Sequence, residues 1–98
     1  MGYVINVYAA SNLDELVSQE SCESFEAAAK GGYEILVERI REKLTYYYSF
    51  YTNDDLALEI ERFEDQFVKT EMTLINNRPS LTFFSKDLDV LIEAYAPD

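Results

Sequence analysis

The chain has 98 residues, nineteen of them acidic and eight basic, which gives a formal net charge of -11. A field of this sign repels nucleic acid and anionic membranes and attracts basic surfaces. The chain contains no histidine and a single cysteine, which excludes an internal disulfide and catalysis by a cysteine–histidine pair.

The length suits a single domain over residues 1–98, with a core large enough to fold without a disulfide or a metal. No apolar run approaches the roughly 20 residues that cross a bilayer, and the first residues lack the pattern of a secretory leader. We therefore expect a cytoplasmic protein. Cys22 fits a reducing compartment; its position before a predicted helix favours reactivity, but a buried or incidental thiol is the commoner case.

The N-terminal segment Tyr3–Ala9 is rich in β-branched and aromatic residues and alternates along the chain, which predicts a strand. Two interpretations fit the residues that follow. Glu15–Ser21 forms a second strand that pairs back on the first, or Asn12–Val17 forms a short helix. We favour the hairpin, because the second strand would cover an edge of the first.

A long amphipathic helix is predicted from Ser24, a suitable N-cap, to Tyr51. The pair Gly31–Gly32 costs about 1 kcal/mol per glycine inside a helix, which predicts either close packing on a sheet or a kink. The apolar side of this helix comprises Phe25, Ala28, Ala29, Gly32, Leu36, Ile40, Leu44 and Tyr47.

The end of this helix is open to two interpretations. A straight helix to Tyr51 would span about 42 Å, whereas a compact domain of this length is roughly 30 to 35 Å across. Either the helix ends near Leu44 and residues 45–52 form a strand, or its last turns project from the body. We favour the helix, because no glycine or proline intervenes.

A second helix is predicted over residues 54–68, antiparallel to the first. Thr52, Asn53 and Asp54 supply its capping signal, and Leu56, Ile60, Phe63 and Phe67 supply its apolar side.

The runs Thr70–Ile75 and Leu81–Phe84 predict a β-hairpin with its turn over residues 76–80. Residues 87–95 have apolar residues at helical spacing and predict a short closing helix. The expected fold is α+β: a small antiparallel sheet of two β-hairpins with a long helix, a second acidic helix and a short C-terminal helix on one face.

Acidic residues on the two predicted helices are the first candidates for contact with a partner. Glu34, Glu38 and Glu42 step by about 6 Å along the first helix, comparable to the spacing of phosphates on a nucleic-acid strand. This acidic face is interrupted and partly neutralised by four basic residues, Lys30, Arg39, Arg41 and Lys43. The second helix adds Asp54, Asp55, Glu61, Glu64 and Asp65.

A cluster of tyrosines forms the second candidate. Its rings are too many for one face of a helix, so some are expected to be exposed and to anchor a partner, since tyrosine is enriched in binding hot spots. The alternative is that they seal one end of the core. The candidate residues are Tyr46, Tyr47, Tyr48 and Tyr51, and Phe50 is the fifth ring of the same segment.

No catalytic, cofactor-binding or metal-binding motif is recognisable, and we expect a protein that is not an enzyme. Glu61 with Glu64 and Asp65 are carboxylates suited to acid–base chemistry or to Mg²⁺, but acids paired on a helix more often form a solvated face.

We expect a small acidic inhibitor that blocks a basic nuclease or nucleic-acid-binding complex, in the manner of a nucleic-acid mimic, without binding nucleic acid or membrane itself. In size and composition the chain is similar to phage anti-CRISPR and anti-restriction proteins and to immunity proteins that neutralise nuclease toxins; no family motif accompanies this likeness. The alternative is a structural module, or a homodimer through the tyrosines, whose acidity serves only solubility.

Overall fold

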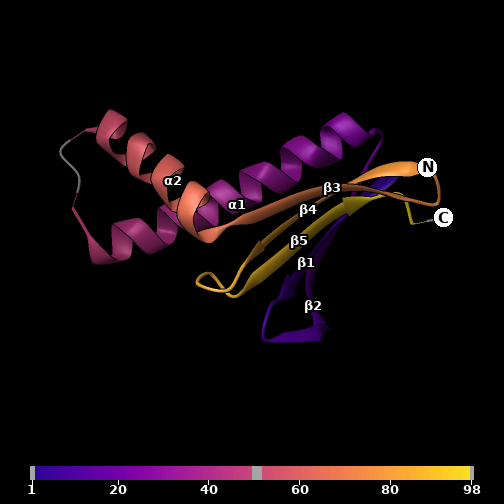
Figure 1. Cartoon of the computed structure of the whole chain (residues 1–98), viewed down its shortest axis with the longest axis horizontal. Coiled ribbons are helices and arrows are strands. Elements are labelled where there is room, and N and C mark those ends of the chain that lie inside the picture. Colours follow the sequence, from indigo (N-terminus) through magenta and orange to yellow (C-terminus); the bar gives the residue numbers. More distant parts are fainter. Residues whose placement is uncertain (1, 50–51, 98) are drawn as a thin grey trace.

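The chain folds as an α+β structure in which a long helix lies on one face of a five-stranded antiparallel sheet (Figure 1). The computed structural model describes residues 2–49 and 52–97. The strand order in the sheet is β2-β1-β5-β4-β3. In chain order the elements are β1 (Tyr3–Ala9), β2 (Asn12–Cys22), α1 (Phe25–Tyr47), α2 (Asn53–Phe67), β3 (Lys69–Ile75), β4 (Arg78–Ser85) and β5 (Val90–Tyr95).

The first hairpin is confirmed. β1 has the predicted bounds, and β2 pairs with it in antiparallel register, with Ile5 opposite Glu20. The alternative of a short helix over Asn12–Val17 is wrong, because these residues belong to β2. The pairing register of the two strands shifts at Val17. Val7 pairs with Ser18 and Tyr8 pairs with Leu16, so Val17 has no partner on β1 and forms a bulge.

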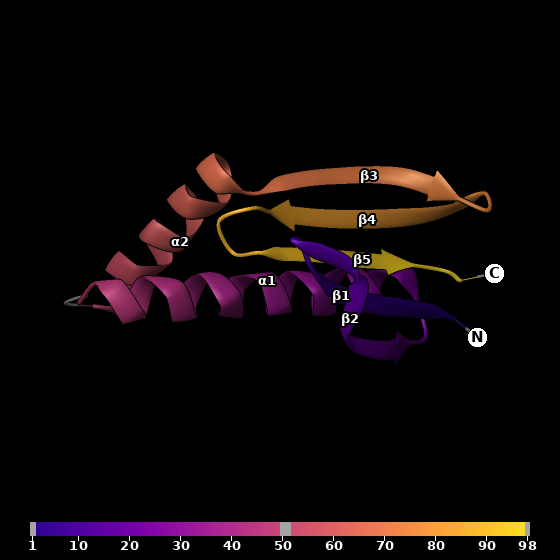
Figure 2. The ribbon, with the colours of Figure 1, turned by 90° about the horizontal axis from the view of Figure 1, so that it is seen from below.

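Helix α1 begins as predicted and ends earlier. The Ser24 hydroxyl accepts a hydrogen bond from the Ala27 backbone N–H at 3.1 Å. The last helical hydrogen bond runs from the Tyr48 N–H to the Leu44 carbonyl, and Tyr48 itself is extended. The strand alternative is wrong for residues 45–47, which are helical, and Tyr51 lies outside the described residues. Figure 2 shows the C-terminal end of α1 extending beyond the sheet, which is the second of the two predicted alternatives.

The two adjacent glycines bring α1 close to the sheet. A Cβ at Gly31 would lie 2.7 Å from Ile5 Cδ1, and a Cβ at Gly32 would lie 3.4 Å from Ile92 Cγ2. Close packing is therefore confirmed, and α1 continues through both residues without a break.

The core lies between α1 and the central strands. Alternate residues of β1 and β5 face the helix, and Phe83 of β4 joins them. Ile60 and Phe63 extend the same cluster into α2. The other buried members are Ile5, Val7, Ala28, Leu36, Ile40, Leu44, Val90, Ile92 and Ala94.

Helix α2 starts at a threonine cap and runs back over α1 at an inclination (Figures 1 and 2). The Thr52 hydroxyl accepts a hydrogen bond from the Asp55 N–H at 3.1 Å. The observed bounds, Asn53–Phe67, differ by one residue at each end from the predicted 54–68.

The β3–β4 hairpin is also confirmed, with a tighter turn than the predicted residues 76–80. Asn76 and Asn77 have φ angles of 57° and 63°, the left-handed pair that a two-residue type I′ turn requires. β4 therefore begins at Arg78.

The predicted C-terminal helix over residues 87–95 is wrong, because Val90–Tyr95 forms β5 between β1 and β4. Val90, Ile92 and Ala94 are buried, and the residues between them are only half-buried, so the observed period is two. Such a short apolar run fits either period in the sequence alone. The description of the sheet as two hairpins is incomplete, because β5 is the fifth strand that joins them.

Within residues 2–49 and 52–97, neither helix is long and apolar enough to span a membrane.

Candidate partner-binding surface

The three ladder carboxylates lie on the exposed side of α1. Glu34, Glu38 and Glu42 are all exposed, and they alternate along the helix with the buried residues Leu36 and Ile40. Their common face is therefore as predicted. Glu38 also pairs with Arg41, 3.0 Å away, an exposed ion pair that partly neutralises the middle of the ladder.

Four of the five predicted acids on α2 are exposed. Asp54 and Asp55 lie in the first turn, where a carboxylate favours the positive end of the helix dipole. Glu61 and Asp65 are exposed farther along α2.

Glu64 has a structural contact instead. Tyr33 donates its phenolic hydrogen to Glu64 Oε1 at 2.8 Å and so fastens α2 to α1. This hydrogen bond, together with partial burial and the charges of Glu64 and Glu61, raises the pKa of Tyr33 to about 12. The carboxylate of Glu64 is thus engaged within the protein.

Most of the predicted acids make no ion pair with a described residue. In the described part of the chain the ion pairs are Arg41–Glu38, Arg62–Glu59 and Lys69–Glu71, so only Glu38 among the eight predicted acids is paired. α1 has four acids and four bases, so its formal charge is zero, whereas α2 has six acids and one base. The uncompensated negative charge of the two helices therefore lies on α2.

Three tyrosines at the C-terminal end of α1 are exposed, by 82% for Tyr46, 66% for Tyr47 and 64% for Tyr48. The prediction that rings of this cluster are exposed is confirmed for these three, and the alternative that they seal the core is wrong for them. Tyr51 lies outside the described residues.

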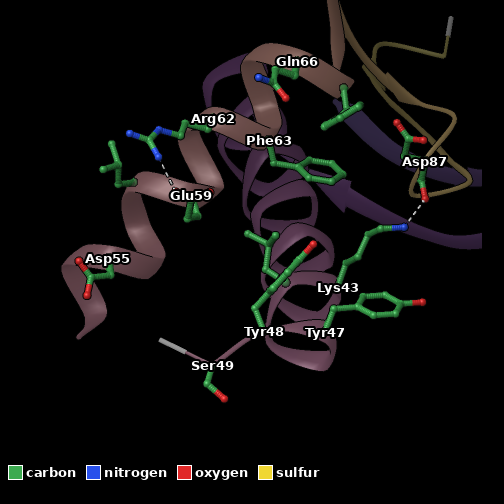
Figure 3. Close-up of a pocket in the computed structure, with 13 residues that line it drawn as sticks. Lys43, Tyr47, Tyr48, Ser49, Asp55, Glu59, Arg62, Phe63, Gln66 and Asp87 are labelled. Atoms are coloured by element: carbon green, nitrogen blue, oxygen red, sulfur yellow. Dashed lines mark hydrogen bonds and ion pairs between the residues drawn. The ribbon is translucent and has the colours of Figure 1, made fainter. Parts of the chain in front are cut away.

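A groove of about 900 Å³ lies between α1 and α2, next to the turn that precedes β5 (Figure 3). Tyr48 and Phe63 lie within it, Lys43 and Asp87 lie on one side, and Asp55 and Arg62 lie on the other. Leu44, Tyr47, Leu58 and Phe67 contribute further apolar surface.

The two bases of this groove are already engaged. Lys43 Nζ donates to the Asp87 carbonyl oxygen at 3.0 Å and lies 6.0 Å from the centre of the Tyr47 ring. Arg62 Nη1 lies 2.6 Å from Glu59 Oε1. The side-chain carboxylates of Asp55 and Asp87, by contrast, make no ion pair with any described residue.

Only some of the predicted partner-binding residues line the groove, and the sequence did not indicate which. The groove brings together Tyr47, Tyr48 and Asp55 from the predicted set, whereas the ladder carboxylates do not line it. Phe67 was expected only as part of an apolar helix side, and its 45% exposure at the groove is the feature that the sequence missed. The acidic ladder and the groove are two distinct surfaces.

A polar network on the sheet face opposite α1 was also missed. Asn6 is 3% exposed, and its amide donates to the hydroxyls of Tyr8 and Tyr95 at 3.2 and 3.1 Å. Its carbonyl oxygen accepts from Gln19 Nε2 at 2.7 Å, so the buried amide is satisfied. Burial raises the pKa of the neighbouring Glu93 carboxyl. This network fastens β2, β1 and β5 together.

Two further observations concern metal-binding side chains and the single thiol. Over the described residues, no three side chains of the metal-binding types gather closely enough to hold an ion. Cys22 is half-buried, and burial with the nearby Glu20 charge raises the pKa of its thiol, away from the reactive thiolate.

No protein-family model, curated protein or solved structure matches this chain.

Proposed function

We propose that the protein is a non-catalytic inhibitor that binds a basic nucleic-acid-handling protein through the outer faces of α1 and α2. The observation that carries the proposal is that seven of the eight predicted acids on these faces make no ion pair with a described residue. A net charge of -11 steers a basic protein toward such a surface.

The ladder favours competition with nucleic acid. Glu34, Glu38 and Glu42 are held on one rigid helix at steps of about 6 Å, a spacing that suits a row of phosphate-binding bases. A surface of this kind fits the groove in which the partner protein binds nucleic acid, although it carries no nucleobase for the partner to recognise. The partner is a nuclease or an effector complex, and an immunity protein against a nuclease toxin uses the same chemistry.

The test is inhibition of purified basic nucleases in the presence of competing duplex DNA. We expect inhibition that DNA relieves, and affinity that falls steeply with salt. Replacing Glu34, Glu38 and Glu42 together with glutamine should weaken binding about tenfold, or 1.4 kcal/mol.

The matched control removes three acids from β2 by Asp14→Asn, Glu15→Gln and Glu20→Gln. All three are exposed. This variant therefore loses as many negative charges as the ladder variant, while the ladder itself is kept. Equal losses of affinity in both triple variants, or binding that does not respond to salt, would contradict the proposal that the ladder binds the partner.

The alternative function is a homodimer through the exposed tyrosines. The exposure of Tyr46, Tyr47 and Tyr48 favours it, because such rings are suited to an interface. Sedimentation velocity distinguishes the alternatives: a dimer that Tyr47→Ser dissociates supports the homodimer, and a strict monomer rules it out.

A further inference from the structure

We propose that the groove between α1 and α2 binds arginine side chains of the partner. This inference rests on the proposed function, because it assumes a basic partner, but it assigns the contact to a surface other than the ladder. Two tyrosine rings line the groove. Tyr47 already has a cation, Lys43 Nζ, 6.0 Å from its ring centre. Tyr48 lies within the same groove, is 64% exposed, and has no cation over its ring among the described residues.

Arginine fits this setting better than lysine. A guanidinium group is planar, stacks on an aromatic face and forms paired hydrogen bonds with a carboxylate, whereas an ammonium group acts as a strongly hydrated point charge. The groove offers both partners, since Tyr48 lies between sides that carry Asp55 and Asp87 (Figure 3).

The charges of the groove exclude two other classes of occupant. Asp55 and Asp87 stand on opposite sides, and with Glu59 the acids that line the groove outnumber its two bases, which disfavours a phosphate. A wholly apolar helix would cover both carboxylates without compensating them, which is costly. An arginine-bearing segment supplies the missing cations and covers the aromatic surface of Phe63 and Tyr48.

Two residues beside the groove provide matched controls. Tyr46 is next to the tyrosines of the groove and is the most exposed of them, yet it does not line the groove. Asp54 precedes Asp55 in the same helical turn and does not line the groove either. Variants of Tyr46 and Asp54 therefore change composition and net charge without removing a residue that lines the groove. The Tyr46 ring does pack edge-on against the Tyr47 ring, with centres 4.9 Å apart, so Asp54 is the cleaner control.

The experiment measures binding of two fluorescent peptides by anisotropy, one with three arginines and one with three lysines in the same glycine background. We expect the arginine peptide to bind about fivefold tighter. Tyr48→Ser and Asp55→Asn should each weaken its binding about fivefold, Tyr46→Ser and Asp54→Asn less than about twofold, and Tyr48→Phe should retain binding because the ring remains.

Circular dichroism and thermal unfolding of each variant show whether the helices are intact; Tyr48→Phe and Asp55→Asn carry the test if Tyr48→Ser does not fold. Equal affinity for the two peptides, or equal losses at groove and control positions, would overturn the arginine site. If the arginine peptide binds as expected and no basic nuclease is inhibited, the proposed function fails and the site stands. If nucleases are inhibited through the ladder while groove variants and controls behave alike, the site fails and the function stands.

Discussion

At the scale of single residues, contacts between neighbours in sequence were predictable and distant contacts were not. Ser24 is the predicted cap, and Thr52 is one of the three residues of the predicted second capping signal; each accepts a hydrogen bond from a backbone N–H three residues along the chain. Glu64 was assigned to a partner, yet it bonds Tyr33, which lies 31 residues away. Nothing in the sequence pairs those two residues, since the contact exists only after α2 has folded back over α1.

The Tyr33–Glu64 hydrogen bond gives a prediction for alkaline pH. The folded pKa of Tyr33, about 12, lies above the ordinary value of 10 for tyrosine, so the native state favours the neutral phenol. The stability from this contact is fully present below pH 10 and is lost as pH rises toward about 12. Tyr33→Phe should lower the free energy of unfolding at pH 7 by about 0.5 to 1 kcal/mol.

Ultraviolet absorbance of tyrosinate, taken as the difference between the unmodified protein and Tyr33→Phe, measures this titration directly. Urea unfolding measures the loss of stability. Tyr46→Phe is the control, because the Tyr46 side chain is 82% exposed and the loss of its hydroxyl should leave stability unchanged. A Tyr33 titration centred near pH 10 would show that the contact does not persist in solution.

At the scale of helices and strands, periodicity was sufficient where an element was long and ambiguous where it was short. The stripe of α1 recurs over 23 residues, so its buried side and the exposure of Glu34, Glu38 and Glu42 followed from the sequence. β5 has six residues, and its apolar positions fit a helix and a strand alike. Its place between β1 and β4 is a long-range property that the local pattern does not contain.

The packing of α1 on the sheet predicts opposite effects for its adjacent glycines. A methyl group at Gly32 would meet Ile92 at 3.4 Å, an ordinary contact, so Gly32→Ala should raise the free energy of unfolding by about 0.5 to 1 kcal/mol through helix propensity. A methyl group at Gly31 would meet Ile5 Cδ1 at 2.7 Å, which forces a buried side chain to move. Gly31→Ala should therefore lower stability by about 1 kcal/mol.

Urea unfolding of both variants checks this pair, each serving as the control for the other because their intrinsic helix propensities change equally. Stabilisation by both substitutions would mean that Ile5 yields without cost. Destabilisation by both would mean that the space between Gly32 and Ile92 of β5 is too small for a methyl group.

At the scale of the whole molecule, the sequence predicted total charge but not its division between surfaces. The count of -11 and the helical positions indicated two acidic faces. The groove arises where α1, α2 and the turn at Asp87 meet. The two helices are consecutive in the chain, but the turn at Asp87 is distant in sequence, and composition does not bring it to them. The same limit explains why Phe67 was expected only as part of an apolar helix side.

Net charge also predicts how the fold responds to salt. Like charges repel within the compact state, and few of them are paired, so screening should stabilise it. We expect the free energy of unfolding to rise by about 1 kcal/mol between low salt and roughly 0.5 M sodium chloride, while binding of a basic partner weakens over the same range.

Thermal and urea unfolding across this salt series measure the effect. The triple glutamine variant of Glu34, Glu38 and Glu42 carries three fewer charges and should respond less. A fall in stability with salt would mean that ion pairs such as Arg62–Glu59 outweigh the repulsion.

The central place of β5 has a consequence for the order in which the chain folds during synthesis. The hairpins β1–β2 and β3–β4 leave the ribosome first, but no ladder joins them until residues 90–95 have emerged. The Asn6–Tyr95 hydrogen bond spans 89 positions of the chain, so the closing contacts are among the most distant that it makes. Until then Val7 of β1 and Phe83 of β4 lack Ile92, the β5 residue that pairs with both of them. Nascent chains stalled before residue 90 should hold two separate hairpins and depend on chaperones, and release of the last strand should complete the sheet in one step.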